Sequence, residues 1–149
     1  MRSMWEPAAA EEMRNRLARL TFDRPGKWGR MTAPEMVCHL AQSLKMALGE
    51  LAVEPKRLPI RFPPLKQLIV YVAPFPKNVR TAPELLTRAP GGWRADVADL
   101  QSLVDRFSAR GGDTQATWPA HPAFGRLSRR AWGVLVYRHM DHHLRQFGA

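Results

Sequence analysis

An all-α fold is predicted by apolar residues at helical spacing, by capping-box strings and by the lack of strand-like alternation. We expect a four-helix bundle in which a long Pro-rich crossover joins the second and third amphipathic helices. The 149 residues fit one domain, residues 1–149, long enough to bury a core without disulfides or metal as staples.

The first two helices are marked by apolar stripes and by one capping signal. Residues 7–20 carry Met13, Leu17 and Leu20 on one side, with charged residues between them. Thr32-Ala33-Pro34-Glu35 is a capping box with proline in the first turn. We therefore expect the second helix to begin there and to run to about Leu51.

The stretch from Glu54 to Pro90 holds eight prolines and is predicted to be mostly crossover. Within it, residues 65–72 are apolar enough for a short helix, and Thr81-Ala82-Pro83-Glu84 repeats the capping-box pattern. The third long helix is expected over residues 96–109, closed by Gly111-Gly112.

The last helix is expected from Arg129 to Phe147, with Ser128 as N-cap and Gly148 just past its end. Its apolar stripe leads into histidines, because five residues share the face of His139: Trp132, Leu135, Val136, His143 and Gln146. The opposite and flanking positions, where water can solvate a side chain, hold Arg138, Asp141 and Arg145.

The pair His139 and His143 is spaced i,i+4, so both imidazoles face inward one turn apart and can bind one divalent ion. The alternative is a buried, hydrogen-bonded pair, which is costly without a shared partner. A third ligand must be His39 or His121; His39 is preferred, because a helix holds a ligand more rigidly than a loop does.

Three other polar residues are candidates for the surroundings of that site. His142 lies on the flank of the helix, where a supporting or surface role fits better than ligation. Gln146 could orient a ligand or serve as a helix-end hydrogen-bond partner, and His121 fits loop packing better than substrate contact. Cys38 points away from the side of His39 and is expected to fill the core.

The formal charge of +10 raises the question of an anionic partner. Because the basic residues are scattered and show no recognition motif, we expect a general surface property, and nucleic acid is not the expected partner. The single cysteine excludes an internal disulfide and favours a reducing, cytoplasmic location. With no apolar leader and no spanning run, we expect no membrane partner.

The strings Cys38-His39-Leu40 and His139-x-x-His142-His143-x-x-Gln146 resemble the DinB/YfiT-like superfamily of metal-binding four-helix bundles. The segment from His121-Pro122-Ala123-Phe124-Gly125 to His142-His143-Leu144-Arg145-Gln146-Phe147-Gly148 is similar to its uncharacterised branch. The usual terminal motif of the superfamily is HxxHHRGQ, so this chain differs by Leu144-Arg145. The resemblance implies His39, His139 and His143 as metal ligands. Some members are S-transferases or isomerases that use a low-molecular-weight thiol.

The expected cofactor is a divalent ion, zinc or nickel first, with iron, cobalt and manganese as alternatives. The first function class is a metal-dependent S-transferase or hydrolase of small molecules, which would use an open coordination position. Met140 stands where an HExxH metalloprotease has its glutamate, so that mechanism lacks its base. The second class is a non-catalytic stress-response or binding module whose basic surface meets nucleic acid or another polyanion. The sequence does not determine the oligomeric state, and a homodimer is one candidate assembly.

Overall fold

The structure, a computed structural model, describes residues 1–78 and 81–149. Across these residues every regular element is helical, apart from one isolated bridge between His121 and Gly125. The long helices are α1 (Pro7–Ala18), α2 (Ala33–Ala47), α4 (Trp93–Gly112) and α5 (Arg129–Gln146). The short elements are η1 (Pro59–Arg61), α3 (Leu65–Gln67), the π-helical η2 (Leu68–Val72) and the 3₁₀ turn η3 (Pro83–Leu86).

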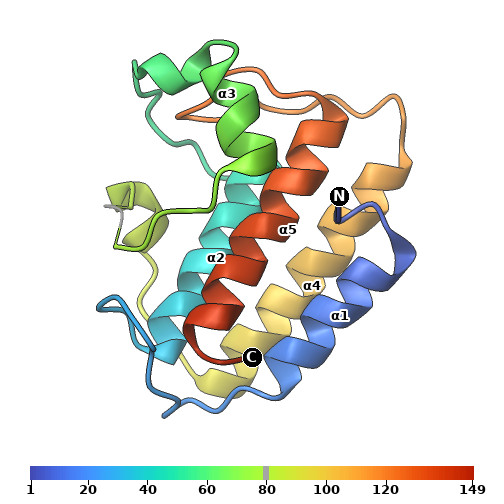
Figure 1. Cartoon of the computed structure of the whole chain (residues 1–149). Coiled ribbons are helices and arrows are strands. Elements are labelled where there is room, and N and C mark those ends of the chain that lie inside the picture. The colour runs from blue at the N-terminus through green and yellow to red at the C-terminus, as the bar shows by residue number, and fades with distance from the viewer. Residues whose placement is uncertain (79–80) are drawn as a thin grey trace.

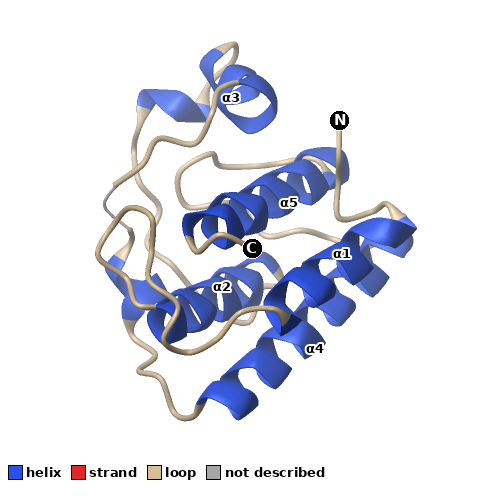
Figure 2. Ribbon diagram, turned by 60° about the horizontal axis from the view of Figure 1, so that its bottom comes forward, coloured by secondary structure: helices blue, strands red, loops and turns tan. Residues whose placement is uncertain are grey.

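The four long helices lie side by side (Figures 1 and 2), and each contacts two others. Helix α1 packs on α4 and α5, and α2 packs on the same two helices from the other side. The main core lies between them and includes the fully buried Met13, Leu40, Leu103 and Met140. The prediction of an all-α fold is confirmed. No helix in the described part of the chain is both long and apolar enough to span a membrane.

Helix α2 begins as its sequence predicts and ends earlier. The Thr32 side chain accepts from the Glu35 N–H, and the Glu35 carboxylate accepts from the Thr32 N–H, which completes the capping box. The helix stops at Ala47 instead of Leu51, because Gly49 takes a φ of +81° and the Glu50 N–H bonds back to the Lys45 carbonyl.

Helix α4 is longer than predicted at both ends. The Asp96 carboxylate accepts from the N–H groups of Gly91 and Gly92, so the helix starts at Trp93. Gly111 does not end the helix but lies inside it, against the ring of Trp5. A Cβ at Gly111 would lie 1.9 Å from that ring, so this glycine is required by packing.

The crossover between α2 and α4 contains the expected short helix, with α3 leading directly into η2. A second, smaller core of Val70, Phe124, Ala131 and Leu135 fixes this segment to α5. The second capping box was a wrong prediction. Ala82 is the N-cap of η3 and no side chain caps it; the Glu84 carboxylate accepts instead from the Glu54 N–H.

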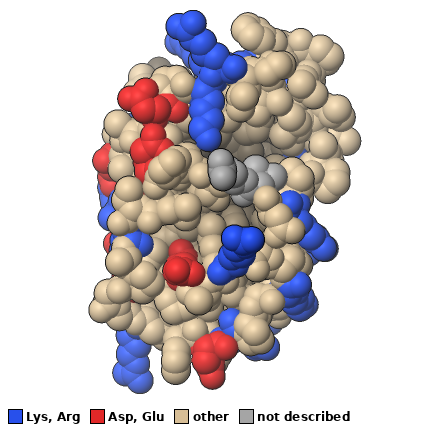
Figure 3. All heavy atoms as spheres, turned by 90° about the vertical axis from the view of Figure 1, so that its left-hand side faces the viewer, with Lys and Arg blue, Asp and Glu red and all other residues tan. Residues whose placement is uncertain are grey.

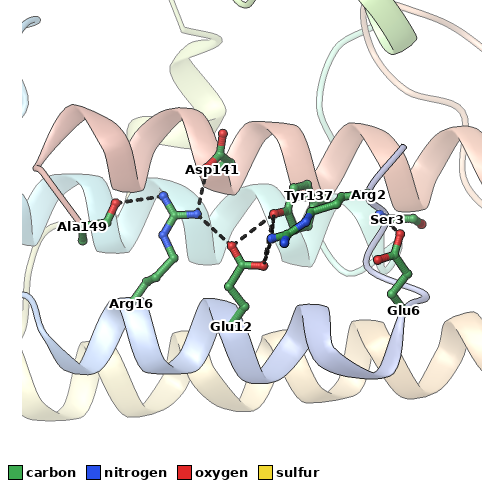
Figure 4. A network of polar contacts seen from close by, with 8 residues as sticks. All are labelled: Arg2, Ser3, Glu6, Glu12, Arg16, Tyr137, Asp141 and Ala149. Atoms are coloured by element: carbon green, nitrogen blue, oxygen red, sulfur yellow. Dashed lines mark hydrogen bonds and ion pairs between the residues drawn. The ribbon is translucent and has the colours of Figure 1, made fainter.

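A polar network joins α1 to α5 (Figure 4). The Glu12 carboxylate accepts from the Tyr137 hydroxyl, and the Arg16 guanidinium donates to Asp141 at 2.8 Å and to the Ala149 carbonyl. Asp141, which the helical pattern places at the surface, is thus an anchor for the last turns of α5. The network lies beside the helix segment that carries the histidines.

Candidate metal centre

Three histidines from two helices converge between α2 and α5. His39 comes from the middle of α2, and His139 and His143 lie one turn apart on α5. Their potential ligand nitrogens all lie within 4.8 Å of one another, close enough for one ion to reach all three after small ring rotations. The ring centroids are 4.8–5.1 Å apart.

The tautomer of His39 follows from its partner on η3. Its Nδ1 lies 3.4 Å from the Leu85 carbonyl oxygen, and a carbonyl can only accept. Nδ1 therefore carries the proton, and Nε2 keeps a free lone pair facing α5. An acceptor on the other ring nitrogen is what a metal-binding histidine needs for a fixed orientation.

The tautomer of His143 is set by a relay of two contacts. The Gln146 side-chain amide donates through Nε2 to the Trp28 carbonyl at 2.7 Å, which turns its Oε1 toward His143. That oxygen lies 2.8 Å from the His143 Nδ1, which must donate. The Nε2 of His143 is therefore also left as a lone pair.

The third histidine closes the cluster. The Nε2 atoms of His39 and His139 lie 3.2 Å apart. Two nitrogens bound to one zinc ion at about 2.0–2.1 Å stand about 3.3 Å apart in tetrahedral geometry. Without an ion, the His139 Nε2 must donate to the bare His39 Nε2, so only His139 has to move its proton to Nδ1 for ligation.

Electrostatics keeps the cluster uncharged at neutral pH. Burial lowers the pKa of His39 to about 4, and burial with the neighbouring His39 lowers the pKa of His143 to about 3. For His139, burial and the imidazoles of His143 and His39 lower the pKa well below its ordinary value. Neutral imidazoles are the form that binds a metal, so no proton has to leave a histidine cation.

Aromatic side chains surround the outer edge of the cluster. The His142 ring lies 5.7 Å from the Trp28 ring and 6.0 Å from the Phe75 ring, centroid to centroid. Phe75 also approaches His139, at 6.4 Å, and the Lys77 ammonium lies 4.4 Å over Trp28. His142 therefore belongs to this aromatic edge, and its ring does not join the three potential ligands.

His121 is placed away from the three histidines, in its own loop. Its Nδ1 accepts from the N–H groups of Ala123 and Phe124, and its ring packs on Trp132 with centroids 5.5 Å apart. Burial lowers the pKa of His121 to about 4. The loop-packing interpretation of this residue agrees with these contacts.

Several contacts of the site have no local sequence signal. The carbonyls of Leu85 and Trp28 act through the backbone, whose position depends on tertiary structure. Arg138, expected in solvent, instead donates to the carbonyls of Ile69, Val70 and Ala73 at the end of η2. Those carbonyls have no further helical partner, and a guanidinium fork can satisfy several of them.

Cys38 directly precedes His39 in the sequence, and its side chain is buried, but it is not among the three potential ligands. Burial raises the pKa of its thiol, which keeps it protonated at neutral pH. The expectation that it fills the core agrees with its burial.

One family matches the chain, over residues 6–149, and its description is "Protein of unknown function (DUF1569)". No curated protein and no solved structure matches the chain.

Proposed function

Because the chain belongs to the DUF1569 family of proteins of unknown function, we propose its function from the site: a divalent-metal protein that acts on small molecules. The ligands are the Nε2 atoms of His39, His139 and His143. The observation that carries the proposal is the convergence of three uncharged imidazoles, two of them oriented by acceptors on Nδ1.

The arrangement of the long helices supports a four-helix bundle of the DinB-like kind. Their contacts form a closed ring, α1 to α4 to α2 to α5 and back to α1. In such bundles, metal sites are built from inward side chains on facing helices. Both the ring and the site on α2 and α5 fit that description.

The chemistry we assign is metal-dependent hydrolysis or S-transfer. A zinc ion held by three histidines supplies Lewis-acid activation of water or of a thiol at its open position. The protein's own groups orient the ligands through Leu85 and Gln146, and the rings of Trp28 and Phe75 limit the access of bulk water. A small thiol fits this site, because zinc and cobalt accept soft sulfur ligands.

The first test is metal content and affinity. Protein purified without a histidine tag should hold one ion per chain by elemental analysis, and zinc titration of the stripped protein should show one site. His143→Ala should abolish stoichiometric binding, because two ligands remain. His142→Ala is the matched control on the next residue and should retain binding. Normal affinity in His143→Ala, or equal loss in both variants, contradicts the ligand assignment.

The second test addresses the reaction class. Cobalt-loaded protein has a visible spectrum that reports its ligands. Adding glutathione or cysteine should change that spectrum through a new sulfur ligand, whereas serine should not. A spectrum that no thiol alters would exclude the S-transfer branch and leave hydrolysis.

A further inference from the structure

A basic and apolar groove lies on the crossover, away from the histidines. It encloses about 770 Å³ and is lined by Arg57, Leu58, Phe62, Lys66, Phe124 and Arg126, among others. We call these six residues the crossover groove. Helix α3 and the loop before α5 lie together at one end of the molecule (Figure 1).

The exposed apolar side chains of the structure are concentrated in this segment. Among the described residues, eight large hydrophobic side chains are exposed, and five of them fall within residues 58–72: Leu58, Phe62, Leu65, Leu68 and Val72. Phe62 and Val72 are each 69% exposed. Val70 on the other face of the same turn is buried against α5, so the segment is already anchored and its outer apolar face is free.

The charge around this face has one sign. Residues 55–78 contain five Lys or Arg side chains and no Asp or Glu, and residues 114–140 contain Arg126, Arg129, Arg130 and Arg138 with no acid. Arg57, Lys66 and Arg126 take part in none of the ion pairs found among the described residues. In Figure 3 the upper right of the face is almost entirely tan, blue side chains lie at the top centre and along the right edge, and the red atoms lie on the left and lower parts.

We propose that the crossover groove and the apolar side chains around it bind the surface of a membrane that contains anionic phospholipid. Cations at the groove contact the headgroup phosphates, and Phe62, Leu68 and Val72 enter the interfacial layer. Exposed apolar groups beside unpaired cations fit a partner that offers anionic groups above hydrocarbon. This surface attachment differs from the expectation of no membrane partner, which considered only a leader or a spanning run.

Charge and apolarity together select this occupant over two others. A nucleic-acid backbone would neutralise the cations but leave Phe62 and Val72 in water. A second copy of the chain that presented the same groove would bring like charges together, because no acid lines the groove to pair them. A lipid surface satisfies both properties of the face.

The test is sedimentation of the full chain with vesicles. Protein should sediment with vesicles of phosphatidylcholine mixed with phosphatidylglycerol, and not with phosphatidylcholine alone, and added salt should release it. Removing two cations in Arg57→Gln with Arg126→Gln should weaken binding about thirtyfold. The control is Arg19→Gln with Arg24→Gln, two exposed arginines that follow the end of α1. It changes the net charge by the same amount and should weaken vesicle binding much less.

An apolar pair separates lipid from other anions. Phe62→Ser should weaken vesicle binding about tenfold, whereas Phe22→Ser, at a comparably exposed phenylalanine between α1 and α2, should not. A circular dichroism spectrum equal to that of the native protein shows that each variant is folded. Absence of binding to anionic vesicles overturns the proposal. An equal loss of vesicle binding in Phe22→Ser also overturns it. Tighter binding to duplex DNA that Phe62→Ser leaves unchanged would indicate a nucleic-acid site, and a dimer that Phe62→Ser dissociates would indicate a second copy of the chain; either result overturns the proposal.

Discussion

The histidine cluster and the crossover groove flank the same helix, α5, but they carry opposite electrostatic character. The cluster is a set of three imidazoles, His39 buried and His139 and His143 part-buried, that desolvation keeps uncharged; the pKa of His39 is lowered to about 4. The groove is an open set of basic groups that are charged at neutral pH, with Arg57 and Arg126 exposed. Both regions are rich in nitrogen, but neutral imidazoles can bind a cation, whereas protonated guanidinium and ammonium groups attract anions.

This contrast explains why a net charge of +10 says little about any one site. Where imidazoles lose their solvent, the neutral form is favoured and a cation can bind. Where guanidinium groups remain in water, they stay protonated and attract anions. Three substitutions at part-buried or buried positions test the first half of this contrast and the contact between α5 and the crossover, from the largest expected effect to the smallest.

The largest effect concerns a buried imidazole outside the cluster. The unfolded chain takes up a proton at His121 near pH 6.5, whereas the folded protein does so only near its lowered pKa of about 4. Stability from this residue is therefore complete above pH 6.5 and decreases as the pH falls toward 4, by about 3 kcal/mol. His121→Asn, whose side chain can accept from the same N–H groups, should remove that part of the pH dependence in metal-free protein. Urea unfolding at pH 7 and pH 5 measures it; an unchanged slope contradicts the assignment.

Arg138 tests the contact between α5 and the crossover segment. Arg138→Gln removes donors to three carbonyls at the end of η2, and we expect the free energy of unfolding to fall by about 2 kcal/mol. Arg145→Gln is the matched control, because the Arg145 side chain is 72% exposed and its ion pair with Asp141 is long, at 3.8 Å. Equal unfolding curves for the two variants would show that the carbonyl contacts contribute nothing.

Gln146 tests the orientation of a ligand without removing it. Gln146→Leu leaves His143 in place but removes the acceptor at its Nδ1, so zinc affinity should fall about tenfold or somewhat more. Gln146→Glu keeps an acceptor and should retain more of the affinity. Competition with a chelator of known affinity measures the change. If Gln146→Leu binds as tightly as the native protein, the relay from Trp28 to His143 has no role in binding.

The features that could be predicted from the sequence are those whose signals lie close together along the chain. The i,i+4 spacing, the Thr32 capping box and the Ser128 N-cap depend on neighbours along the chain, and α2 and α5 begin where these signals predict. Helical periodicity also predicted that His39 faces the core, as His139 and His143 do, because the apolar stripes of α2 and α5 both face inward.

Other features depend on distant backbone and were missed for that reason. The acceptor for His39 is a carbonyl 46 residues away, and the partner of Gln146 is a carbonyl 118 residues away. The end of α4 was predicted wrongly because Gly111 is required for the close approach of the Trp5 ring and does not end the helix. In a sequence, glycine is equally compatible with a helix end and with a close packing contact. Arg138 was predicted to lie in solvent because the helical pattern of α5 carries no information on the crossover carbonyls that pack against it.

Arg138 and His139 are consecutive residues of α5, one fixed to the crossover and the other facing the histidine cluster. One turn of α5 therefore connects the histidine cluster to the crossover segment that carries the groove. If occupancy of one changes the affinity of the other, thermodynamic reciprocity requires the same factor in both directions. Measuring zinc affinity with and without vesicles, and vesicle affinity with and without zinc, closes such a cycle and gives the coupling between the two ends of the protein twice, independently.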